Sequence, residues 1–297
     1  MNLSSLPISL NLHTREAEAN VLAWGRNFGI VRNGSLIIQY KVLWFAGYTL
    51  PYLDKPSLER AMKLFLCLHH LDELLENCVF EEAQAFFHMW CEFSYVENYD
   101  SPFSPLSCAL ADVLMDMEHS GNAEWSEFLW FNMDDYLGSK RWEFDYKNRG
   151  ILPDLDSSVK QAGFGSGVFP ALHFLKMDWR AERYPIEWVE FELCRICCLS
   201  NDLVLFKKFK KSQLGANELV LRQIDLGLSD VEILRHGGNF LMELLKSFSE
   251  VVECVRMEGG SRADWADELR LFLGGCLYWS EENALRYGTK INGINKT

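Results

Sequence analysis

Residues 56–76, PSLERAMKLFLCLHHLDELLE, combine the period of a buried helix with an acidic end. Proline is favoured in the first turn of a helix, so Pro56 marks a plausible helix start. Apolar residues then recur every three or four positions, which is the spacing of one helical face. The residues on this spacing are Met62, Phe65, Leu66, Leu68, Leu71, Leu74 and Leu75. The stretch therefore predicts a long α-helix whose last turns carry carboxylates.

The same helical period continues through most of the chain. Similar patterns predict helices over 80–97, 105–118, 123–137, 185–212, 229–258 and 262–288. Gly, Pro and Ser interrupt the period at 147–167, which predicts a loop or a kinked helix. No short strands alternate with turn signals, so the predicted class is all-α. Several predicted helices are apolar over more than one stripe, which suits a single-domain helical bundle whose central helices are surrounded by others or line a central hydrophobic cavity. Residues 1–35 lack a sustained period and are expected to form an N-terminal arm before one helical domain over 36–297.

Composition excludes several classes of protein. The chain has 297 residues, of which 48% are hydrophobic, so it can bury a full core. Its formal charge of -13 disfavours binding to nucleic acid or to anionic membranes. No run of 18 apolar residues predicts a membrane span, and the first 20 residues lack the pattern of a signal peptide. Nine cysteines scattered through apolar segments fit a reducing compartment, so we expect a cytoplasmic protein.

The acidic end of the first predicted helix is a candidate metal site. Asp72 and Glu76 are four residues apart and therefore lie on one helical face. Mg²⁺ prefers oxygen ligands and commonly keeps waters and substrate phosphates in its coordination shell. Two carboxylates beside a cavity would suit it, whereas the alternative is an ordinary solvated helix turn.

A second polar group interrupts an otherwise apolar predicted helix. Asn201 and Asp202 follow a largely apolar stretch that begins at Trp188. A buried amide needs a hydrogen-bonding partner or a ligand. Asn201 is therefore a candidate second metal ligand facing Asp72, or else a core amide bonded to a neighbouring helix.

The end of the last predicted helix carries a possible anion site. Arg286 could bind a diphosphate through two hydrogen bonds, with the Tyr287 hydroxyl as a further donor. The alternative is an arginine paired with a surface acid near the chain terminus.

These three elements together, in this order within one helical chain, resemble the class I terpene synthases of the bacterial and fungal type. Asp72-Glu73-x-x-Glu76 is similar to the family's aspartate-rich motif, Asn201-Asp202-Leu203 to the start of its second metal motif, and Arg286-Tyr287 to its C-terminal pair. Gly215–Val220 and Gly167–Pro170 also resemble family segments. The resemblance covers roughly residues 40–290.

The resemblance implies a Mg²⁺-dependent enzyme that ionises a prenyl diphosphate and rearranges the carbocation in a dry, aromatic cavity, with farnesyl diphosphate preferred. It implies that Asp72, Glu76 and Asn201 bind metal. It implies that Lys208, Arg286 and Tyr287 bind the substrate. Phe65 and Trp279 are the expected cavity-lining aromatics, because ring faces stabilise cations. Some members of the family pair as homodimers, so the resemblance leaves a homodimer open, although the sequence carries no interface signal.

The chain departs from the family pattern at the second metal motif. Leu205 and Phe209 stand where the family has oxygen ligands, and neither side chain can bind Mg²⁺. The family's diphosphate-sensing arginine is also missing near Ala162. Lysines at 207–211 could replace the lost positive charge. Two alternatives to a terpene synthase stay open: prenyl transfer to a nucleophile other than water, and a non-catalytic isoprenoid-binding protein.

Three other motifs predict ordinary structure. Cys194-x-x-Cys197-Cys198 lacks a second pair at zinc spacing and is expected to pack in the core. Asp134-Asp135 is expected to be solvated, and the glycines at 163, 165 and 167 are expected to give backbone freedom at a helix break.

Overall fold

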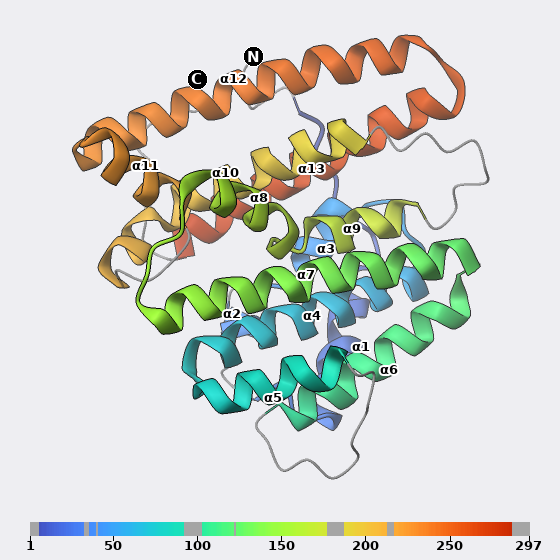
Figure 1. Cartoon of the computed structure of the whole chain (residues 1–297). Helices are drawn as coiled ribbons and strands as arrows, with labels where there is room; N and C mark the ends of the chain where they lie inside the picture. Colours follow the sequence, from blue (N-terminus) through green and yellow to red (C-terminus); the bar gives the residue numbers. More distant parts are fainter. Residues whose placement is uncertain are drawn as a thin grey trace.

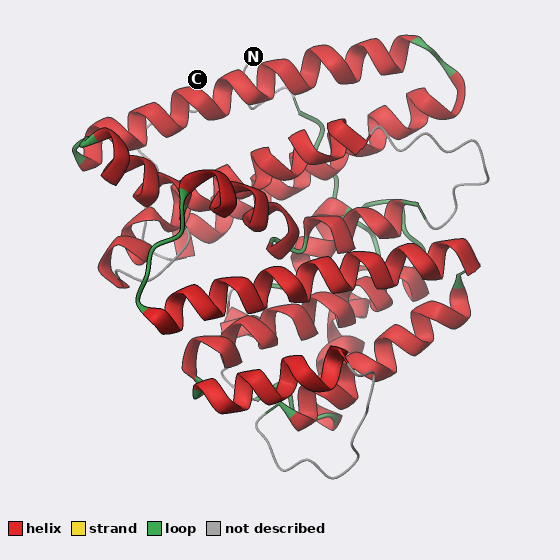
Figure 2. Ribbon diagram, viewed as in Figure 1, coloured by secondary structure: helices red, strands yellow, loops and turns green. Residues whose placement is uncertain are grey.

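The computed structural model describes residues 6–32, 36–39, 41–91, 103–121, 123–176, 187–212 and 217–286. These residues form thirteen helices and no strand (Figures 1 and 2), which confirms the predicted all-α class. The helices are α1 (Thr14–Asn27), α2 (Leu36–Gln39), α3 (Trp44–Thr49), α4 (Lys55–Asn77), α5 (Phe80–Cys91), α6 (Ser104–Ser120), α7 (Ala123–Arg149), α8 (Leu155–Gly165), α9 (Val168–Leu175), α10 (Glu187–Ser212), α11 (Glu218–Leu226), α12 (Asp230–Met257) and α13 (Gly260–Arg286).

Helix α4 is the predicted long apolar helix. It begins at a conventional cap, because the Asp54 side chain accepts a hydrogen bond from the backbone N–H of Ser57 and Pro56 follows in the first turn. Ten of its 23 residues are buried, on more than one face. It packs against α1, α3, α6 and α9, so neighbours surround it. The acidic end of α4 is thereby carried on a rigid, buried support.

The long helices form two groups with shorter helices between them (Figure 1). Helices α10, α12 and α13 pack against one another, and α12 runs along one edge of the molecule. Helices α4, α6 and α7 lie in the other half. Helices α8 and α9 contact both α7 and α10, so they connect the two groups. This arrangement brings the end of α4 opposite α10 and α13.

The predicted break at 147–167 is confirmed only in part, because the helix α8 lies between two interruptions of the chain. Helix α7 ends at Arg149, well beyond the predicted end at 137, and Gly150 then takes a left-handed φ of 65°. Helix α8 starts at an Asp154 cap that accepts from the N–H of Ser157. Gly167, at φ 75°, separates α8 from α9. A residue with a side chain would be strained in either left-handed position.

The first 35 residues contain a helix that the sequence pattern did not predict. Helix α1 packs against α4, with Ala17 and Val21 fully buried. Gly25 allows this close approach, because an added Cβ there would lie 2.6 Å from Val31 Cγ2 and 2.8 Å from Leu66 Cδ2. The division of the chain at residue 35 stays a prediction. In the part of the chain that is described, no helix is long and apolar enough to cross a membrane.

His173 on α9 gives the fold a pH-dependent stability. Its ring is 1% exposed and stacks on Trp125, and burial lowers its pKa to about 3. The unfolded chain takes up a proton near pH 6.5, so the free energy of unfolding falls as the pH drops below 6.5. We expect a loss of about 2 kcal/mol between pH 6.5 and 5 from this group alone. Urea unfolding at both pH values measures it, and the His173→Phe variant should show a shallower pH dependence. If the free energy of unfolding depends on pH equally in the unchanged protein and in His173→Phe, another group causes the effect.

Candidate functional site

A cavity of about 430 Å³ lies between the end of α4, α7, α8 and the facing sides of α10 and α13. Four of the predicted site residues line it, namely Asp72, Glu76, Asn201 and Trp279. These residues are far apart in the sequence, so the fold brings three separate motifs to one space. The volume is within the range of about 300–1,000 Å³ that small-molecule sites occupy.

One wall of the cavity is acidic and contains a paired lysine. Asp72 Oδ1 lies 3.0 Å from Lys140 Nζ, and Glu143 Oε2 lies 3.6 Å from the same nitrogen. Burial lowers the pKa of Lys140, but the negative charges of Asp72 and Glu143 outweigh burial and raise it well above its usual value. The lysine is therefore charged, and it compensates the charge of the carboxylates around it.

The acidic motif divides between the cavity and the helix surface. Asp72 and Glu76 face the cavity, as their spacing predicts. Glu73 points elsewhere and lies 3.8 Å from His69 Nε2 and 3.6 Å from His70 Nδ1. Only two of the three carboxylates in the motif therefore line the cavity.

The opposite wall is formed by α10. Asn201 and Asp202 both line the cavity, and the Asp202 carboxylate also accepts a 2.7 Å hydrogen bond from the backbone N–H of Glu218. The Asn217 side chain caps α11 and also donates to the Asp202 carbonyl oxygen at 3.1 Å. Burial raises the pKa of Asp202 to about 8. Asp202 thus joins α10 to the start of α11.

One of the two positions at which this chain has an apolar residue in place of a metal ligand lies on this wall. Leu205 lines the cavity. The side chains of Lys208, Phe209 and Arg286 and the whole of Tyr287 lie outside the described residues. The described part of α10 therefore offers the cavity the Asn201 amide and the Asp202 carboxyl group, among thiol and apolar side chains.

Aromatic rings form a further wall. Trp279 and Phe45 line the cavity with ring centroids 5.3 Å apart, and the Trp279 indole N–H donates to the Lys41 carbonyl oxygen at 3.2 Å. Phe65 is not among the described residues that line the cavity. It packs edge-on behind Phe45, at 5.3 Å between centroids. These contacts fix the rings that face the cavity.

The C-terminal end of α8 reaches the cavity between the two walls. Gln161, Ala162, Gly165 and Ser166 line the cavity there. The Ser139 hydroxyl donates to the Gln161 carbonyl oxygen at 2.7 Å, and a Cβ on Gly165 would lie 2.7 Å from Ser139 Oγ. The end of α8 is therefore packed closely against α7.

The sequence profile described as "Terpene synthase family 2, C-terminal metal binding" matches residues 63–246, which is more than half of the chain. The chain belongs to the terpene synthase family. The matched residues include both cavity walls that α4 and α10 provide, and the family is described as metal binding.

Solved structures of terpene synthases have the same fold. The linalool/nerolidol synthase of Streptomyces clavuligerus superposes with a TM-score of 0.78 at 17% identity, over 92% of this chain and 98% of that one. The same enzyme in complex with 2-fluorogeranyl diphosphate gives 0.77 at 16% identity, over 91% and 99% of the two chains. A cucumene synthase variant gives 0.76 at 16% identity, over 96% and 98%. Among curated proteins, no sequence matches this chain.

The donor set of this cavity fits a metal ion on one wall. Within the described ranges, no three His, Cys, Asp or Glu side chains are grouped so that they could hold a metal by themselves. Mg²⁺ commonly uses only one or two carboxylates and completes its shell with water and substrate phosphates. Asp72 and Glu76 meet that requirement, whereas Leu205 cannot contribute on the opposite wall. The fit is therefore to a cation on the acidic wall.

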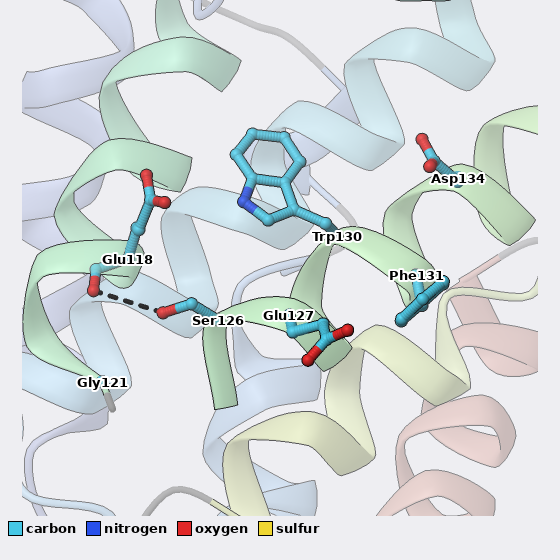
Figure 3. Close-up of a pocket in the computed structure, with 7 residues that line it drawn as sticks. All are labelled: Glu118, Gly121, Ser126, Glu127, Trp130, Phe131 and Asp134. Carbon is cyan, nitrogen blue, oxygen red and sulfur yellow. Dashed lines mark hydrogen bonds between the residues drawn. The ribbon is translucent and has the colours of Figure 1, made fainter. Parts of the chain in front are cut away.

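A second hollow, of about 520 Å³, lies over α6 and α7 (Figure 3). Trp130 and Phe131 line it together with three acidic side chains, Glu118, Glu127 and Asp134. Its charged lining residues are all acidic, so it repels a diphosphate. Asp134 is exposed, as predicted, and accepts a hydrogen bond from the Trp90 indole at 3.0 Å. The cavity beside Asp72 is thus the candidate site.

Three charged residues of the site were not identified from the sequence. Lys140, Glu143 and Lys147 on α7 all line the cavity. Lys147 Nζ lies 3.5 Å and 3.4 Å from the carbonyl oxygens of Leu75 and Glu76, at the end of α4. Glu143 and Lys147 follow Lys140 by three and seven residues, so the three side chains share one face of α7. This spacing is the only signal of the cluster in the sequence.

Proposed function

We propose that this chain is a Mg²⁺-dependent terpene synthase that ionises a prenyl diphosphate and converts the carbocation to a cyclic or linear terpene. The observation that carries the proposal is one cavity with an acidic wall at Asp72 and Glu76 and an aromatic wall at Phe45 and Trp279. An acidic wall suits a metal–diphosphate group, and an aromatic wall suits a carbocation.

Each wall has a separate part in the proposed reaction. Asp72 and Glu76 would hold Mg²⁺, with Asn201 contributing from α10. A metal held by these residues would neutralise negative charge on the diphosphate and so make it a better leaving group. Phe45 and Trp279 would present ring faces to the developing cation, and their apolar surfaces would keep water away from it.

Farnesyl diphosphate is the preferred substrate in this proposal. The cavity of about 430 Å³ lies toward the lower end of the range of small-molecule sites. This volume favours a chain of intermediate length over geranylgeranyl diphosphate. The linalool/nerolidol synthase binds 2-fluorogeranyl diphosphate on the same fold, which supports a prenyl diphosphate as the substrate class.

The cytoplasm is the proposed location. Among the described residues, eight cysteines are free thiols, and four of them are buried. Free thiols persist in reducing compartments, because disulfides form readily in oxidising ones.

The apolar Leu205 favours a second candidate. A site with one metal-binding wall could retain isoprenoid binding without catalysis, or could pass the prenyl cation to a nucleophile other than water. The distinction between these functions depends on products, which a direct assay measures.

The deciding experiment incubates the purified protein with geranyl, farnesyl or geranylgeranyl diphosphate, with Mg²⁺ or with a chelator. Gas chromatography and mass spectrometry then identify extracted products. We expect a Mg²⁺-dependent hydrocarbon or terpene alcohol, formed fastest from farnesyl diphosphate. If none of the three substrates gives a product while the protein still binds them, the non-catalytic binding function replaces the synthase.

A further inference from the structure

Two lysines on one face of α7 extend toward the acidic wall. Lys140 and Lys147 are seven residues apart and both line the cavity. Among the described residues of the lining, theirs are the only ammonium groups. Lys147 is directed to the carbonyl oxygens at the end of α4, where a cation is favourable. Lys140 instead reaches the carboxylate of Asp72.

The Lys140 side chain is enclosed but still lines the cavity. It is 13% exposed, whereas Asp72 and Glu143 are 43% and 41% exposed. Its nitrogen lies 3.0 Å from Asp72 Oδ1, so it uses the same carboxylate that the proposed function gives to the metal. Two carboxylates this close to each other repel, and the ammonium between them offsets that repulsion. Lys140 and a metal ion would therefore compete for Asp72.

The rest of the lining shows where a displaced ammonium could go. The end of α8 contributes Gln161 and Ala162 but no cationic side chain among its described lining residues. A lysine side chain has a flexible four-carbon stem and three donors, so it can change acceptors without movement of its helix. Phosphate oxygens placed next to a metal on Asp72 would lie within its reach.

We propose that Lys140 is a diphosphate-binding residue that exchanges partners, pairing with Asp72 when no metal is bound and with the diphosphate once a metal occupies Asp72. This inference rests on the proposed function, because it assumes that a metal and a diphosphate meet at the acidic wall. It assigns to α7 the positive charge that the sequence suggested for lysines of α10. In both states the ammonium group lies beside a negatively charged partner.

The exchange predicts opposite effects of Lys140→Met on two ligands. Without the competing ammonium, Mg²⁺ alone should bind several-fold more tightly than to the unchanged protein. Inorganic diphosphate, titrated in saturating Mg²⁺, should bind at least about tenfold more weakly, because a charge-assisted hydrogen bond is lost. Isothermal titration calorimetry of the full chain measures both affinities. If Lys140 had only a structural role, its replacement would weaken the binding of both ligands.

Two further variants complete the test. Lys246→Met removes a lysine that is 73% exposed on α12, and it should change neither affinity. Lys140→Arg keeps the charge and should retain diphosphate binding. If Lys140→Met does not fold, Lys140→Gln gives the same comparison with a neutral donor in place of the ammonium.

The outcomes separate this inference from the proposed function. Terpene formation by the unchanged protein, with equal diphosphate affinity in the Lys140 variants, would overturn the role of Lys140 and leave the synthase intact. Lys140-dependent diphosphate binding without any terpene product would support the exchange and reject the synthase. Failure of the unchanged protein to bind diphosphate would overturn the exchange.

Discussion

The Asp72→Asn variant is expected to lose nearly all terpene formation. The substitution keeps the size of the side chain but removes the negative charge that a metal on the acidic wall requires. Metal-ion stabilisation of a leaving group contributes several kcal/mol, so we expect turnover to fall by on the order of 10³-fold. Product formation from farnesyl diphosphate at saturating Mg²⁺ measures the loss.

Glu73→Gln is the matched control for Asp72→Asn. Glu73 belongs to the same acidic motif but lies beside His69 and His70 rather than in the cavity. Glu73→Gln removes the same charge, but it should therefore keep most of the turnover of the unchanged protein. Thermal unfolding should differ little between the two variants, because Glu143 remains beside Lys140 when Asp72 is replaced. Equal activity in both variants would exclude Asp72 as a metal ligand.

The sequence predicted the acidic wall because its information is local. The period of α4 and the spacing of Asp72 and Glu76 together determine which face carries the carboxylates. The helix break at Gly150 and Gly167 was predicted for a similar reason, since glycine and proline act on their own backbone. Helix α1 was missed because residues 1–35 show no sustained period, and the contact that Gly25 allows with α4 is visible only in the fold.

Long-range contacts account for what the sequence did not reveal. Lys140 lies in a strongly charged part of α7 that resembles a solvated surface, and only the approach of α4 makes it a cavity residue. Asp202 looks like a partner of Asn201, but its role depends on the N–H of Glu218, 16 residues away. Phe65 lies on the expected face of α4, yet Phe45 from α3 stands between it and the cavity.

A backbone contact between α13 and α3 sets the position of the aromatic wall, and Gly275→Ala should disrupt it. An added Cβ on Gly275 would lie 2.1 Å from the Tyr48 carbonyl oxygen, which is backbone and cannot rotate away. Helices α3 and α13 would have to separate, and we expect a loss of about 3 kcal/mol in the free energy of unfolding, the upper end of typical overpacking costs. Denaturant unfolding measures this loss.

The same contact links stability to the site, because Phe45 belongs to α3 and Trp279 to α13. Gly275→Ala should therefore also change product distribution at temperatures where the variant is folded, since the two rings that face the cation would move apart. Gly238→Ala is the matched control: it lies within α12 with no atom within 4 Å of an added Cβ. There the substitution should stabilise the protein by up to about 1 kcal/mol, because alanine favours helix, and should leave the products unchanged. A Gly275→Ala variant as stable as Gly238→Ala would show that α3 and α13 do not hold this contact in solution.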